Sequence, residues 1–109
     1  MPSPLERAFH AEMLDIYKRA KSETGYNASR FLSMVSERGG LETARALLHA
    51  PTISDGYRAL WQYGRLDLTV EAVILDEKWH ELFTESERHI AKERLQKFGS
   101  TGSLDEDGT

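Results

Sequence analysis

The sequence predicts an all-α fold, a compact single domain of five or six short helices with a disordered acidic C-terminal tail. Apolar residues recur every three or four positions through most of the chain, as in helices with one buried face. Capping residues, Pro and Gly interrupt this pattern where helices would begin and end. The 109 residues suffice for one core. We therefore place the helical domain at residues 3–99 and the flexible tail at residues 100–109.

The N-terminal segment carries the clearest helix pattern, over residues 5–24. Ser3 can cap this helix, Pro4 suits its first turn, and Glu6 completes a capping box. Gly25 is a typical end. The apolar stripe of this helix comprises Leu5, Phe9, Met13, Ile16, Tyr17 and Ala20.

Two short helices follow, on either side of a glycine pair. Asn27 can cap the second helix, and Gly39 and Gly40 end it because paired glycines favour turns. The third covers residues 41–48, since Pro51 cannot continue it. Their buried stripes would be Ala28, Phe31, Leu32 and Val35, and then Leu41, Ala44, Leu47 and Leu48.

The fourth helix lies in the aromatic centre of the chain. It begins at Ser54 or Asp55 and ends at Gly64. Tyr57 and Trp61 are four residues apart, which places both on one helix face. We therefore expect these two aromatic side chains in the core.

A fifth, short and very apolar helix covers residues 70–75, with Asp67 or Thr69 as its cap. A β-strand is the alternative, because Val, Ile and Leu run together there. We favour a helix, since no second strand-like segment could pair with a lone strand and satisfy its backbone.

The C-terminal third predicts a turn and then a last helix. Residues 79–83 suggest an irregular or 3₁₀ turn. Thr84 and Glu87 form a second capping box, and Gly99 would close the helix that they open. Its buried positions would be Ile90, Ala91, Leu95 and Phe98. The residues that follow are rich in Gly and Ser and then acidic, which is typical of a flexible tail.

Composition excludes several classes of site. The chain has no cysteine, so it has no disulfide, thiolate nucleophile or Cys-based metal site. Its longest apolar run, Ala72–Leu75, is far shorter than the roughly 20 residues of a membrane-spanning helix. The N-terminus lacks the apolar core of a secretory signal. We expect no membrane association and a cytoplasmic location.

No motif for catalysis or metal binding stands out. The nearest approach to a ligand pair is Glu6 and His10, which we interpret as a surface pair one helical turn apart. No nucleophile elbow or phosphate-binding loop occurs. The acidic residues Asp67, Glu71, Asp76 and Glu77 are spaced like a solvated helix face. We therefore expect no enzymatic activity, no cofactor and no metal.

Charge is distributed unevenly along the chain. The formal net charge is −4, but residues 26–66 carry five arginines, no lysine and three acids. Residues 67–109 carry five basic and eleven acidic groups. Because Arg pairs bidentately with carboxylates, we interpret these arginines mainly as partners, across the fold, of acids in the C-terminal third. The alternative is an arginine cluster that faces a ligand or a nucleic acid.

Aromatic residues beside these arginines favour a protein-interaction or accessory module. Tyr63 and Trp79 fall off the apolar stripes, so we expect both at the surface. Exposed aromatics and Arg are frequent anchors of protein interfaces. The predicted binding residues are Arg58, Tyr63, Arg65 and Trp79, and the partner is another protein or a second copy.

A DNA-binding accessory protein is the alternative function. Residues 31–49 follow the outline of a helix-turn-helix. In this reading Arg30 and Arg38 contact phosphates, while Arg45 and His49 face a groove. The acidic net charge argues against it.

Four sequence blocks follow one another along this chain, namely Tyr26–Leu32, Gly39–Ala44, Gly64–Ala72 and Trp79–Thr84. Together they resemble a family of small all-helical bacterial proteins, over about residues 8–99. Members occur alone or as a terminal module of larger proteins, and no activity is established for the family. The resemblance therefore implies an adaptor rather than a catalyst and supplies no catalytic residues. The acidic tail departs from the family pattern.

Overall fold

The fold is all-helical. A computed structural model describes the backbone of residues 3–106 and the side chains of residues 3–98, and this part contains no β-strand. Its elements are α1 (Pro4–Thr24), α2 (Ser29–Arg38), α3 (Gly40–His49), α4 (Asp55–Gln62), η1 (Leu66–Leu68), α5 (Val70–Ile74), η2 (Glu77–Leu82) and α6 (Glu85–Glu106), where η marks a 3₁₀ helix. None of the described helices is long and apolar enough to cross a membrane.

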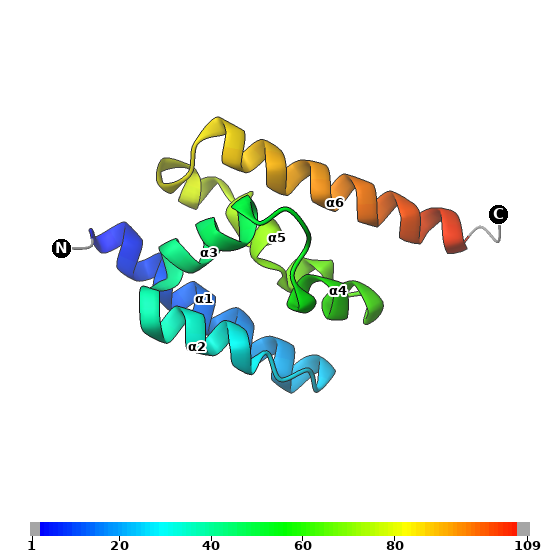
Figure 1. Cartoon of the computed structure of the whole chain (residues 1–109), viewed down its shortest axis with the longest axis horizontal. Helices are drawn as coiled ribbons and strands as arrows, with labels where there is room; N and C mark the ends of the chain where they lie inside the picture. The colour runs from blue at the N-terminus through cyan, green and yellow to red at the C-terminus, as the bar shows by residue number, and fades with distance from the viewer. Residues whose placement is uncertain (1–2, 107–109) are drawn as a thin grey trace.

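The helices form three layers (Figure 1). The antiparallel pair α1 and α2 lies on one side, the long helix α6 lies on the other, and α3 and α5 lie between them. Helix α4 packs at one end of this arrangement. The helix predicted at residues 70–75 in preference to a strand is confirmed as α5.

Most helix starts are capped by the side chains that the sequence indicated. Ser54 and Thr69 resolve the two open choices, because their hydroxyls accept the amides of Tyr57 at 3.0 Å and Ala72 at 3.2 Å. The Thr84–Glu87 capping box is complete, with reciprocal bonds of 2.9 Å and 3.1 Å. These caps require only residues three apart, so they are local features that a sequence can predict.

Two predicted helix boundaries are wrong. Asn27 does not cap α2, whose N-cap is Ala28 without a side-chain bond, because Asn27 Oδ1 accepts the Tyr17 hydroxyl instead, at 2.8 Å. Helix α6 continues through Gly99 to Glu106. Glycine inside a helix costs only about 1 kcal/mol relative to alanine, so it weakens a helix without ending it. The flexibility of residues 100–109 stays a prediction, and residues 107–109 lie outside the described part.

The main core is built around Phe9 of α1. Its ring packs edge-to-face against both Trp79 and Phe83, with centroid distances of 5.3 Å. The other buried members include Met13, Ile16, Val35, Ala44, Leu48, Val70, Val73, Ile74 and Ala91. Helices α1 and α3 approach so closely that a Cβ on Gly40 would lie 2.7 Å from the Cα of His10.

Trp79 is therefore in the core, with 4% of its surface exposed, and not at the surface as predicted. The 3₁₀ turn predicted for residues 79–83 overlaps η2, in which Trp79 lies. Trp79 is buried because it packs against Phe9 of α1, which is distant in the sequence, and local spacing does not indicate such a contact.

An apolar groove as candidate functional site

An open groove separates the α1–α2 pair from α4 and the link that precedes it. Its volume is about 520 Å³, within the range of small-ligand and side-chain pockets. Its walls are mostly apolar and include Ile16, Phe31, Met34, Leu47, Ile53 and Leu60.

The groove stays open because small residues and a loop border it. Pro51 ends α3, so residues 50–54 cross the gap as an irregular link and bring little bulk. Gly56, in the first turn of α4, carries no side chain. A Cβ there would meet nothing closer than Ser54 Oγ at 3.8 Å and the Tyr26 ring at 4.0 Å. A larger side chain at position 56 would therefore extend towards Tyr26 and narrow the groove.

Glu71, one of the residues that line the groove, belongs to a buried ion pair. Arg94 of α6 donates to Glu71 Oε2 at 3.0 Å, and the two side chains are only 14% and 4% exposed. Burial raises the pKa of Glu71, which the hydrogen bond from Arg94 partly offsets. Glu71 is therefore buried, although its spacing in the sequence suggested a solvated helix face.

Arg94 also satisfies the C-terminal end of α3. Its guanidinium donates to the carbonyls of Leu47, Leu48 and Ala50, at 3.1, 3.2 and 2.9 Å. The Tyr57 hydroxyl donates in turn to the Arg94 carbonyl at 3.0 Å, and burial raises the pKa of Tyr57 to about 12. These polar groups have partners within the protein, so the groove offers an occupant mainly apolar contact.

The groove mouth is polar and loosely held. Arg30 and Asp55 face each other there with 3.8 Å between Nη1 and Oδ2, and their side chains are 88% and 84% exposed. Tyr26 lies beside them, and burial together with the charge of Asp55 raises its pKa. An exposed pair at this distance contributes little stability, so both charges are available to a binding partner.

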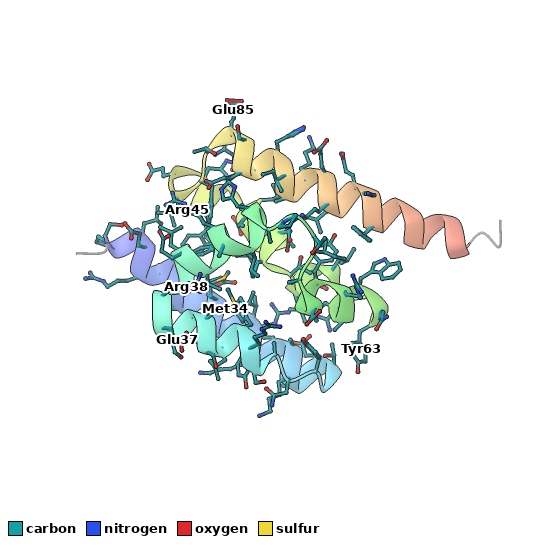
Figure 2. The ribbon with its side chains drawn as sticks, viewed as in Figure 1. Met34, Glu37, Arg38, Arg45, Tyr63 and Glu85 are labelled. Atoms are coloured by element: carbon teal, nitrogen blue, oxygen red, sulfur yellow. The ribbon has the colours of Figure 1, made fainter. Side chains whose placement is uncertain are left out.

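The predicted protein-binding residues do not form one patch. Tyr63 is exposed as predicted, with 56% of its surface accessible, and Arg58 is exposed in the middle of the same helix. Figure 2 shows Tyr63 projecting from the end of α4. Arg65 follows in the next turn but is held by Glu23 at 2.7 Å and Asp67 at 3.0 Å. Trp79 is buried in the main core, so it is not available to a partner of the folded chain.

The predicted DNA-binding residues are also separated. Arg45 lies beside α6, whereas Arg38 lies at the end of α2 (Figure 2). Arg45 donates to the Leu82 carbonyl at 2.9 Å, and His49 Nε2 lies 2.9 Å from Glu87 Oε2. Arg30 is at the groove mouth. A direct role in DNA binding stays a prediction for these four residues.

Glu87 is the carboxylate that holds Arg45 and His49 against α6. Burial favours its neutral form, but the Thr84 amide, His49 and Arg45 outweigh burial and lower the pKa of Glu87. Pairing across the fold with an acid of the C-terminal third is confirmed for Arg45, through Glu87. Arg65 instead pairs with Glu23 of α1 and with Asp67 only two positions away, and Arg30 pairs with Asp55.

His10 has a structural partner that its spacing did not reveal. It is not limited to a surface pair with Glu6, because its Nδ1 accepts the amide of Gly40 at 3.0 Å and so caps the start of α3. Among the described residues, no group of three or more His, Asp or Glu side chains could hold a metal ion.

The buried ion pair between Arg94 and Glu71 was not predicted from the sequence, although one signal for it was present. Arg94 follows Ala91 by three residues and precedes Phe98 by four, so it occupies the apolar stripe of α6. A charged residue on a buried stripe indicates a partner in the core. Glu71 is likewise surrounded by apolar residues in α5.

Comparisons with models of protein families, with curated proteins and with solved structures find no match to this chain. The resemblance to a family of helical bacterial proteins therefore stays an expectation.

Proposed function

We propose that this chain is a helical protein-interaction module whose groove receives apolar side chains of a partner. The open groove carries this proposal, because its apolar walls remain in contact with water in the isolated chain. Covering them would contribute roughly 25 cal/mol for each Å² removed from water.

The surroundings of the groove support the same function. Interfaces commonly combine an apolar centre with a polar rim. Here the rim is supplied by Arg30 and Asp55, and the exposed side chains of Arg58 and Tyr63 extend the surface along α4. Aromatic residues and Arg are the residue types most enriched among interface anchors.

Site-specific photocrosslinking tests the proposal. A benzophenone amino acid replaces Thr52, an exposed residue of the groove wall, or Ser36, an exposed residue of α2 outside the groove. We expect a discrete protein adduct from position 52 in cells that express the chain, and none from position 36. Mass spectrometry of the adduct identifies the partner and the residue attached.

A substitution in the groove supplies the control. Gly56→Met narrows the groove and should abolish the adduct, whereas Gly56→Ala adds one methyl group in ordinary contact and should preserve it. Equal adducts from positions 52 and 36, or an adduct indifferent to Gly56→Met in a folded variant, would contradict the proposal.

A further inference from the structure

We infer that a second copy of this chain occupies the groove, with Tyr63 of each copy inserted into the groove of the other. The inference rests on the proposed function of the groove, and it names the partner. Among the described side chains, Tyr63 is the large apolar one left exposed. With 56% of its surface accessible among the described residues, the Tyr63 ring is available to a neighbouring molecule.

The inserting side chain and the receiving groove lie on one face of α4. Gly56, Ala59 and Tyr63 follow each other at three and four residues, which places them on the same side of a helix. Gly56 borders the groove, and Tyr63 projects from the other end of the helix (Figure 2). The two are separated by seven residues, which is about 10 Å along a helix axis.

This arrangement is self-complementary under a two-fold rotation. If α4 of one copy lies antiparallel to α4 of another, position 63 of each copy lies opposite position 56 of the other. Both contacts then form at once, as an isologous dimer requires. Gly56 and Ala59 are small, so the two helices can approach closely where the pair crosses.

The chemistry of the groove suits a tyrosine ring. The interior is apolar and its lining residues Tyr57 and Glu71 are already bonded, so it can receive the ring. The exposed carboxylate of Asp55 lies at the mouth, 3.8 Å from Arg30, and can accept a hydrogen bond from the tyrosine hydroxyl. Arg58 lies two positions from Gly56 and therefore on a different side of the helix, which keeps its charge away from the two-fold contact.

Sedimentation velocity over a range of concentrations tests the dimer. We expect the wild-type chain to sediment as a concentration-dependent dimer. Tyr63→Ser should raise the dimer Kd about a hundredfold, roughly tenfold for each buried ring lost. Gly56→Met should have a similar effect, while Gly56→Ala, which adds one methyl group in ordinary contact, should retain the dimer. Circular dichroism checks that each variant is folded, and Tyr63→Ser replaces an exposed side chain, so its result stands if Gly56→Met misfolds.

A mixing experiment examines the pairing directly. The Tyr63→Ser chain keeps its groove and the Gly56→Met chain keeps its tyrosine, so an equimolar mixture can form one of the two contacts. We expect the mixture to dimerise more tightly than either variant alone. A gain of this kind would not follow from nonspecific association.

The outcomes separate this inference from the proposed function. A monomeric wild-type chain, or a dimer unchanged by Tyr63→Ser, would overturn the inference. If the position 52 adduct then contains a different protein, the groove still binds a partner and the proposed function stands. If the adduct joins position 52 to the α4 region of a second copy, the inference is supported.

Discussion

Two glycines mark two different regions of this molecule. At Gly40 a side chain would collide with the backbone of His10, so the missing Cβ is what allows α1 and α3 to touch. At Gly56 an added Cβ would meet only ordinary contacts, so this position borders the open space of the groove and not a close approach of two helices. One region is filled by the Phe9, Trp79 and Phe83 rings, while the other is lined by apolar walls without a filling ring. The same residue type therefore closes one region and borders an open one.

The largest loss of stability is expected at the buried ion pair between Glu71 and Arg94, beside the groove. Arg94→Met leaves the buried Glu71 carboxylate without its partner and removes the donor from three carbonyls. We expect a loss of about 3–5 kcal/mol in the free energy of unfolding, measured by urea denaturation. Lys92→Met, an exposed change on the same helix, should alter stability by less than about 0.5 kcal/mol. A loss below about 1 kcal/mol for Arg94→Met would show that the pair contributes little.

The stability of the closely packed region around Gly40 should fall when one methyl group is added there. Gly40→Ala forces the added Cβ against the Cα of His10, which lies at 2.7 Å, so the two helices must separate. We expect a loss of about 1–3 kcal/mol, as for other overpacked sites, in the same denaturation assay. An unchanged unfolding midpoint would mean that α1 and α3 are not held at this distance.

The attachment of α3 to α6 should depend on pH through Glu87. Because its folded pKa is lowered from the ordinary value of 4.5, Glu87 contributes stability that is complete above that value and lost as pH falls through the folded value. Glu87→Gln should cost on the order of 1 kcal/mol near neutral pH, and the difference from wild type should shrink below about pH 4. Glu85→Gln, in the same turn of α6, is the matched control. Parallel pH curves for wild type and Glu87→Gln would contradict the assignment.

The smallest effect should have the opposite sign from that at Gly40. Gly56→Ala replaces a helical glycine whose surroundings accept a methyl group, so we expect a gain of about 0.5–1 kcal/mol. Thermal unfolding of Gly40→Ala and Gly56→Ala side by side is the sharpest test of the comparison. Destabilisation by both variants would remove the distinction between a filled and an open region.

The sequence predicts local features of this fold well and long-range features poorly. The caps at Ser54, Thr69 and Thr84 involve residues three apart, and each is confirmed. The guanidinium of Arg94 donates to carbonyls of residues more than forty positions away in the sequence, and the bond between His10 and Gly40 spans thirty positions. Neither contact can be predicted from the spacing of residues within one helix. Such pairs are set by how the helices pack.

The candidate site is less predictable still. A groove forms where side chains do not fill the space between helices, as beside Gly56. The periodic pattern of apolar residues along a helix does not indicate where such space remains. Tyr63 was identified because it interrupts an α-helical stripe. Trp79 was misplaced because its burial depends on contact with Phe9 of α1, which is distant in the sequence.

The hydrogen bonds from Arg94 to the carbonyls at the end of α3 have a consequence for how the chain folds during synthesis. The last carbonyls of α3 receive their donors from a residue 44 to 47 positions later. While the ribosome has released only the first half of the polypeptide, that end of α3 has only water as a partner. The nascent chain should therefore stay susceptible to proteases until α6 emerges, and then acquire resistance in one step.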